Sequence, residues 1–137
     1  MLALSVGLCW PLGCVERRPV GRIDKLVADL GEAPLGSVHL GAAKPQRNDI
    51  TEELIGYRET AVPALVKALG SDNPVQVGYA AYCLQRMRID TGVPAAKRAL
   101  DKFMQKTKPY ATIEVRFAIL GLRDYISEFE AIPMTPF

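Results

Sequence analysis

A ten-residue string that recurs along the chain constrains its fold more than any other feature. The string TAVPALVKAL begins at Thr60 and returns 31 residues later, from Thr91, as TGVPAAKRAL, with six positions identical. A repeat of about this period is typical of stacked helical hairpins, in which each unit buries its apolar face against its neighbours. We therefore expect a helical array that presents a surface for binding.

Apolar spacing predicts a short helix at the start of each repeat. The segment Arg22 to Leu30 carries apolar residues at the 0, 3, 4, 7 spacing of one helical face, and Gly31 follows it as a stop signal. The same spacing follows Thr60, and it follows Thr91 with one apolar position taken by Lys97; we expect the hydroxyls of the two threonines to cap these helices. Pro63 and Pro94 then fall in the first turn, where a missing N–H costs little.

Each short helix precedes a longer predicted helix. One extends from Pro74 to about Arg88, after the turn Ser71-Asp72-Asn73, and the other from Pro109 to Ser127. Their apolar stripes share one spacing at an offset of 38 residues and comprise Val77, Ala80, Ala81, Leu84 and Met87, then Val115, Ala118, Ile119, Leu122 and Tyr125. These helices are apolar on more than one side, as expected for helices packed between a partner and the next repeat.

The first copy of the repeat is degraded. Its second helix is predicted from about Asp49 to Arg58, capped by Asp49 or Thr51, with Glu52 and Glu53 in the first turn. Residues 31–48 form a long loop rich in Gly, Ala and Pro, and loops of that length are uncommon unless they are functional or mobile. Atypical terminal repeats are normal, because an end cap has one neighbour.

The repeat resembles a known family. Val62-Pro63-Ala64 with Ala68-Leu69, the Ser-Asp-Asn-Pro turn, and the two stripes, in particular Val115-Arg116 with Ala118 and Leu122, are similar to HEAT repeats of the bacterial subtype shared with bilin-lyase-like proteins. The resemblance covers residues 60–128 well and 22–58 poorly. It departs from the motif at Gly78, where an arginine often follows the valine, so the Asp–Arg ladder of the family is incomplete although Asp72 is present.

This resemblance implies an all-α fold: a short α-solenoid of about three HEAT-like helical hairpins, an armadillo-like superhelix, spanning residues 22–130. A C-terminal tail, 131–137, follows it. The function implied is that of a non-catalytic scaffold or adaptor that binds another protein. A bilin-lyase-like accessory protein that handles a chromophore is the alternative from a different class, although fold alone does not determine activity.

The N-terminus has the features of an export signal. Residues 1–14 contain no charge and end in Pro11-Leu12-Gly13-Cys14, which resembles a bacterial lipoprotein processing site. We expect a signal peptide over 1–14, lipid attachment at Cys14, a linker over 15–21, and a location in the cell envelope or periplasm. The alternative is a buried N-terminal helix and a cytoplasmic protein; Gly7, Pro11 and Gly13 weigh against it.

Catalytic motifs are missing from the sequence. It contains no Gly-rich phosphate loop, HExxH or nucleophile elbow, and Cys9, Cys14 and Cys83 have no metal-binding spacing. His39 is the only histidine, and Cys83 is expected in the core as a small hydrophobe. We therefore expect no enzyme activity, catalytic residue, metal or cofactor.

Basic residues gather between Arg86 and Lys108. This stretch holds seven basic residues against Asp90 and Asp101, although the chain has a formal net charge of only +2. Cations at helix C-termini offset the helix dipole, which accounts for Arg86, Arg88 and Lys106. A cytoplasmic nucleic-acid-binding HEAT protein is a further alternative, but such binding requires several phosphate contacts.

The surface expected to bind a partner lies along the two longer helices. Tyrosine and arginine are the residue types that most often contribute interface energy. The candidates are the polar side chains that miss the apolar stripes: Gln76, Tyr82, Gln85, Arg86, Arg116 and Arg123.

Overall fold

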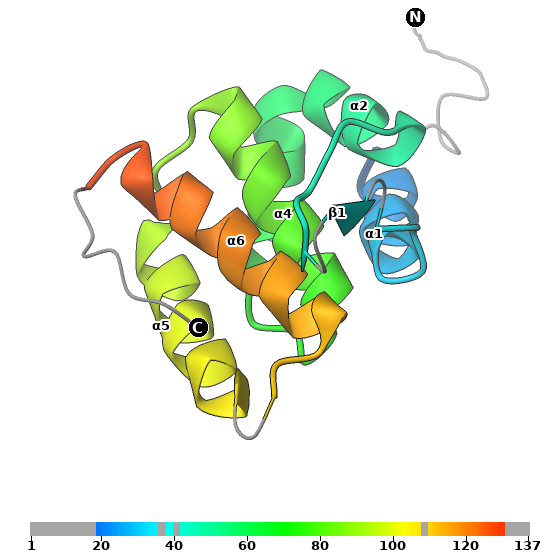
Figure 1. Ribbon diagram of the computed structural model, residues 1–137. Coiled ribbons are helices and arrows are strands. Elements are labelled where there is room, and N and C mark those ends of the chain that lie inside the picture. The colour runs from blue at the N-terminus through cyan, green and yellow to red at the C-terminus, as the bar shows by residue number, and fades with distance from the viewer. Residues whose placement is uncertain (1–18, 36–37, 40–41, 108–109, 131–137) are drawn as a thin grey trace, which may run out of the picture.

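The computed structural model describes residues 19–35, 38–39, 42–107 and 110–130 (Figure 1). Within them the fold is helical, which confirms the all-α class; the described strands are two residues long each. The elements are α1 (Pro19–Leu30), β1 (Val38–His39), β2 (Ala42–Ala43), α2 (Asp49–Gly56), a 3-10 turn (Arg58–Ala61), α3 (Val62–Ala68), α4 (Pro74–Met87), α5 (Val93–Met104), a 3-10 turn (Gln105–Thr107) and α6 (Ile113–Ser127).

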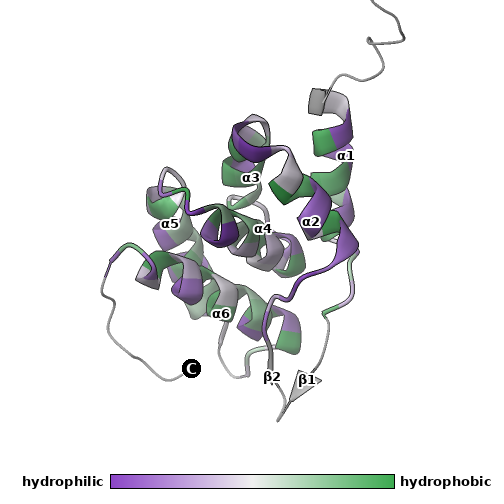
Figure 2. Ribbon diagram, turned by 90° about the horizontal axis from the view of Figure 1, so that it is seen from above, coloured by the Kyte–Doolittle hydropathy of each residue, from purple (hydrophilic) through white to green (hydrophobic). Residues whose placement is uncertain are grey.

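The helices lie in two layers. Figure 2 shows α1, α3 and α5 in a row on one side, with α2, α4 and α6 on the other. The helix α4 is central: its largest contact is with α6, and it also packs against α1, α2 and α3. The strand β1 pairs antiparallel with β2, which contacts α6, so the long loop reaches from α1 across to α6 before α2 begins.

The predicted apolar stripes form the core. Those of α1, α4 and α6 are buried throughout, except that Met87 is only partly buried. Tyr79 and Phe117 join them from the next helical positions, with ring centroids 4.9 Å apart in an edge-to-face contact. The two tyrosines of this core bind loop carbonyls, since the Tyr79 hydroxyl donates to Pro34 O and the Tyr125 hydroxyl donates to Ile89 O at 2.6 Å.

Glycines set the close approach of α4 to α6. A Cβ added to Gly78 would lie 2.5 Å from two ring atoms of Phe117, and one added to Gly121 would lie 2.9 Å from Gly78 O. Both distances are shorter than a methyl group can tolerate in a close-packed interior. An arginine at position 78, which the resemblance to HEAT repeats would imply, therefore has no room here.

The helix caps differ from those predicted at Thr60 and Thr91. The N-cap residues of α3 and α5 are Ala61 and Gly92, both with helical backbone angles and no side-chain cap bond, so the predicted hydroxyl caps are wrong. A side-chain cap requires an extended backbone at the N-cap. That geometry occurs at the residues whose side chains do cap helices α2, α4 and α6: Asn48, Asn73 and Thr112. Pro63 and Pro94 lie in the first turns, as predicted.

Three helix boundaries also need correction. The helix α1 begins at Pro19, inside the segment 15–21 that was expected to be a linker. The helix α2 ends at Gly56, two residues before the predicted end at Arg58. Arg58 itself has a left-handed φ of 53°, which an α-helix cannot include. The helix α6 begins at Ile113 after its Thr112 cap, four residues later than Pro109.

Candidate interaction site

An open hollow lies where α4 and α6 end. Its volume is about 380 Å³, and three of the predicted partner-binding residues line it from α4: Tyr82, Gln85 and Arg86. The rest of its wall comes from the long loop, the end of α4 and α6, namely Lys44, Pro45, Arg88, Asp124 and Glu128. We call this the α4–α6 hollow.

Tyr82 and Arg86 form a unit on one face of α4. They are four residues apart, so they occupy neighbouring turns of one helical face. The Arg86 Nη1 donates to the Tyr82 hydroxyl at 2.8 Å, and the guanidinium carbon lies 5.7 Å from the ring centroid. Hydrogen bonding to Tyr82 is the main cause of the raised pKa of Arg86. The pair offers a partner an aromatic face, a hydroxyl and a fixed cation.

Opposite charges meet around the α4–α6 hollow. Lys44 Nζ lies 3.2 Å from Asp124 Oδ2, and Arg88 Nη1 lies 3.2 Å from Glu128 Oε1. Arg86 Nη1 also lies 3.9 Å from Glu52 Oε2 of α2. Exposed pairs of this kind contribute little to the stability of the fold. A partner with complementary charges therefore exchanges these contacts at little cost.

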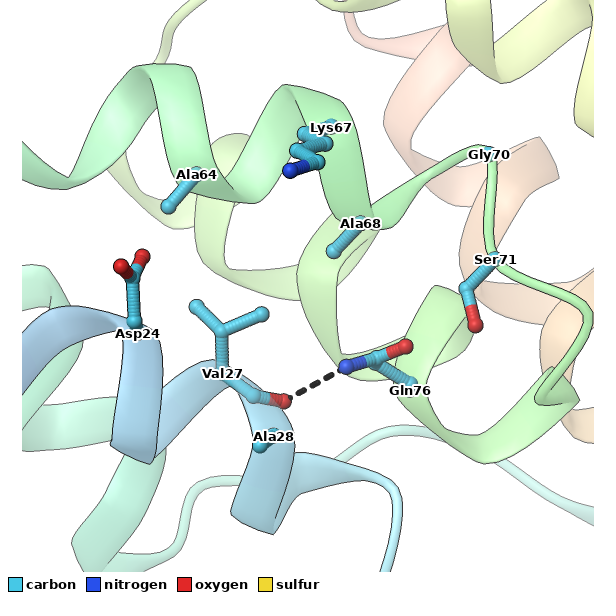
Figure 3. A pocket seen from close by; sticks show the side chains of 9 residues that line it. All are labelled: Asp24, Val27, Ala28, Ala64, Lys67, Ala68, Gly70, Ser71 and Gln76. Carbon is cyan, nitrogen blue, oxygen red and sulfur yellow. Dashed lines mark hydrogen bonds between the residues drawn. The ribbon is translucent and has the colours of Figure 1, made fainter.

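The remaining predicted binding residues lie elsewhere. Gln76 lines a different hollow, between α1 and α3, where its Nε2 donates to Val27 O at 2.8 Å (Figure 3). This bond joins α4 to α1, so Gln76 has a structural contact rather than a free surface. Arg116 and Arg123 are half-buried on α6 and do not line the α4–α6 hollow. The structure thus brings together the candidates at 82, 85 and 86.

Several residues of the hollow were not predicted. Asp124 and Glu128 were not among the predicted binding residues, and Lys44 and Pro45 belong to a loop with no assigned role. The signal for Lys44 and Pro45 was the length of the 31–48 segment, which is typical of functional loops. Nothing local in the sequence indicated that this loop would reach α6.

The basic cluster is divided among several ion pairs and faces. Lys97 pairs with Glu130, and Lys102 Nζ lies 3.2 Å from Asp72 Oδ1. Lys106 lies over the ring of Phe103, 5.3 Å from its centroid. Arg98 lines a hollow between α3 and α5, and Lys108 lies outside the described residues. The described part of the cluster therefore does not form the continuous basic face that a nucleic-acid backbone requires.

The cysteine expected in the core is buried there. Cys83 has no exposed surface, and burial raises the pKa of its thiol well above the usual range, so the thiol stays protonated near neutral pH. His39 lies in β1, but its side chain lies outside the described part of the chain. Cys14, the expected site of lipid attachment, lies outside the described residues as well.

Two other kinds of functional feature, a metal site and a membrane-spanning helix, are absent from the described residues. Among the described residues, no group of three or more His, Cys, Asp or Glu side chains is placed to hold a metal ion. No helix in this part of the chain has the length and apolar character needed to cross a membrane. No family model, curated protein or solved structure matches the chain.

Proposed function

We propose that the protein is a non-catalytic interaction scaffold of HEAT-repeat type that binds another protein at the α4–α6 hollow. The observation that supports this most is the grouping of Tyr82, Gln85 and Arg86 on one open concave surface of about 380 Å³. Tyrosine and arginine at the centre of a concave patch are typical of the residues that contribute most of the energy in protein interfaces.

The surroundings of this site favour a polar, protein-like partner. Two exposed ion pairs, Lys44–Asp124 and Arg88–Glu128, line the same hollow as Tyr82 and bring both signs of charge to it. Mixed charge at the rim gives orientation and specificity to an interface, while the aromatic centre supplies most of its affinity. Because three cations and two carboxylates line the hollow, a partner that carries charges of both signs complements it better than a uniformly charged ligand.

The layered packing of the helices is compatible with a solenoid of about three hairpins. In this proposal α3 with α4 and α5 with α6 are successive repeats, and α1 with α2 is the degraded end cap. The large contact between α4 and α6 and the row of α1, α3 and α5 in Figure 2 support the pairing.

We also propose that the chain is exported and anchored by a lipid on Cys14. The support is the uncharged segment that ends at Cys14, together with the start of α1 at Pro19, which leaves residues 15–18 between the anchor and the first helix. Mass spectrometry of the membrane fraction tests this. We expect a mature chain that begins at an acylated Cys14, and a Cys14→Ala variant that remains an uncleaved precursor. A soluble chain that retains Met1 would contradict the proposal.

Site-specific photocrosslinking tests the binding function. A photoreactive amino acid at Gln85, inside the hollow, should yield one discrete crosslinked protein in the native host. The control is the same group at Lys25, which is exposed on α1, away from the hollow. Equal product patterns from the two positions, or no product from Gln85, would contradict a binding site in the α4–α6 hollow.

A further inference from the structure

The outer layer of helices carries two hollows that repeat each other. One, of about 460 Å³, lies between α1 and α3; the other, of about 410 Å³, lies between α3 and α5. To the first, α3 and the turn after it contribute Ala64, Lys67, Ala68 and Ser71. To the second, α5 contributes the residues 31 positions later in each case: Ala95, Arg98, Ala99 and Lys102.

Burial repeats along with residue type. Ala68 and Ala99 are buried at the floor, with 6% and 4% of their surface exposed, while Lys67 and Arg98 are exposed at the rim. Alanines at the floor leave room that larger side chains would fill. The sequence repeat therefore has a structural consequence beyond packing, because it places an alanine floor and a basic residue, Lys67 or Arg98, at equivalent positions of successive hollows.

The α3–α5 hollow is cationic. Lys67, Arg98 and Lys102 line it, and among the described residues no carboxylate does. The ammonium of Lys102 is bound by Ser71 O at 2.9 Å and by Asp72, so it is already neutralised. No ion pair to a described residue occupies Lys67 or Arg98, which leaves two cations facing one hollow. An anionic group fits between them.

The α1–α3 hollow differs on one wall. Figure 3 shows Asp24 of α1 across the hollow from Ala64 and Lys67 of α3, with Ala68 further along α3. A second anion is therefore disfavoured there, and a small apolar side chain suits the alanine floor. Lys67 lines both hollows, so it lies on the ridge between the α3–α5 hollow, which suits an anion, and the α1–α3 hollow, which suits an apolar side chain.

We propose that these two hollows bind an extended acidic segment of a partner protein that crosses α3. The two hollows lie on either side of α3, and an α-helix with its side chains is about 10–12 Å across. A polyproline II segment rises about 3.1 Å per residue and repeats every three residues, so residues i and i+3 point the same way about 9 Å apart. An acidic residue contacts Lys67 and Arg98, and the residue three positions away enters the α1–α3 hollow.

Other anionic ligands fit this surface less well. A nucleic acid requires a run of phosphate contacts, whereas two cations without described ion-pair partners are present here and the chain's formal net charge is only +2. An anionic membrane requires a broad basic face, whereas Asp24 and Asp101 are exposed on the same helices. The surface lies in the opposite layer from the α4–α6 hollow (Figure 2), so the inference does not depend on the function proposed there.

Fluorescence anisotropy with a labelled peptide of about twelve residues tests the proposal. The peptide is built from Ala-Pro-Pro-Glu-Pro-Pro units, which favour polyproline II and place an Ala three positions from each Glu. We expect saturable binding, and a loss of about fivefold in affinity for each of Lys67→Glu and Arg98→Glu, the upper range for one exposed charge contact. Arg47→Glu, at an exposed arginine of the loop before α2 that lines none of the hollows described, should leave the affinity unchanged. Urea unfolding of each variant checks that the fold is retained.

Two further probes separate the outcomes. The same peptide with Gln in place of Glu should not bind, because it lacks the anion. Vesicles of equal parts phosphatidylglycerol and phosphatidylcholine test a membrane as the ligand. The proposal would be overturned if the Gln peptide bound, or if the three variants bound the Glu peptide with equal affinity. It would also be overturned if the protein bound vesicles but not the Glu peptide.

Discussion

Arg88 closes α4 in a conformation that is costly for any residue with a side chain. It sits in the left-handed region, at φ 58° and ψ 44°, and its backbone N–H bonds to the carbonyls of the last turn. Glycine adopts this conformation at helix ends without the clash of a Cβ, which costs other residues about 1–2 kcal/mol. The Arg88 side chain offsets little of this backbone strain, because its ion pair with Glu128 is exposed to solvent.

Replacing Arg88 by glycine should therefore stabilise the fold. We expect Arg88→Gly to raise the free energy of unfolding by about 0.5–1 kcal/mol, after subtracting the lost ion pair. Urea unfolding measures it, and Glu128→Gln, which removes the ion pair alone, is the control. A lower stability than that of Glu128→Gln would show that the Arg88 side chain is needed.

Tyr125 joins α6 to the turn before α5. Its hydroxyl donates to Ile89 O at 2.6 Å and accepts from Gly92 N at 3.1 Å, and burial raises the pKa of Tyr125 to about 12. The folded state thus favours the protonated phenol. Its contribution is complete below pH 10, the ordinary pKa, and is lost as the pH rises through about 12.

Tyr125→Phe should cost about 1–3 kcal/mol at neutral pH, because the buried N–H of Gly92 loses its partner. The variant should also lose less stability than wild type between pH 10 and 12. Chemical unfolding at a series of pH values measures both effects. Since burial also raises the pKa of Tyr79 and Cys83, only the difference between the two proteins reports Tyr125. Parallel alkaline curves would contradict this role.

At the scale of the helices, the close crossing of α4 and α6 depends on the absence of a Cβ atom at Gly78. We expect Gly78→Ala to lower the free energy of unfolding by about 1–3 kcal/mol, because the methyl group would overlap the Phe117 ring. Gly21→Ala in α1 is the matched control: nothing lies within 4 Å of its added Cβ, so it should stabilise by about 0.5–1 kcal/mol. Thermal or urea unfolding compares them. A stabilising Gly78→Ala would mean that the two helices are not so close.

Helices were predictable where the signal was local. The 0, 3, 4, 7 spacing of Ile23 to Leu30 and the stripes of α4 and α6 identified buried faces correctly. The caps at Thr60 and Thr91 were not predictable from residue type, because a cap depends on backbone angles set by the preceding turn. The role of Gly78 depends on Phe117, which is distant in sequence and adjacent only in the fold.

The candidate site shows the same division. Tyr82, Gln85 and Arg86 could be grouped from the sequence because one helix places them within a turn of each other. Lys44, Asp124 and Glu128 come from a loop and from another helix, so their arrival depends on tertiary packing. Gln76 belonged to the same helix but points to α1, where it bonds Val27 O.

At the scale of the whole molecule, the helical layers leave two kinds of surface. The layer of α2, α4 and α6 carries the α4–α6 hollow, and the layer of α1, α3 and α5 carries the repeated hollows (Figure 2). In the proposed solenoid, such surfaces arise because every repeat presents equivalent side chains at a regular spacing. Most side chains of α4 are buried in the core. In the proposed function, the exposed side of the same helix presents Tyr82 and Arg86 to a partner.

The most direct test of the proposed binding function is quantitative capture of the native partner by wild type and by the double variant Tyr82→Ala with Arg86→Ala. We predict a loss of at least about tenfold in the captured amount, since residues of this kind cost roughly 1–2 kcal/mol or more on truncation. The free energy of unfolding should stay within about 1 kcal/mol of wild type, as for surface changes. Undiminished capture by a fully folded double variant would contradict a partner site at the α4–α6 hollow.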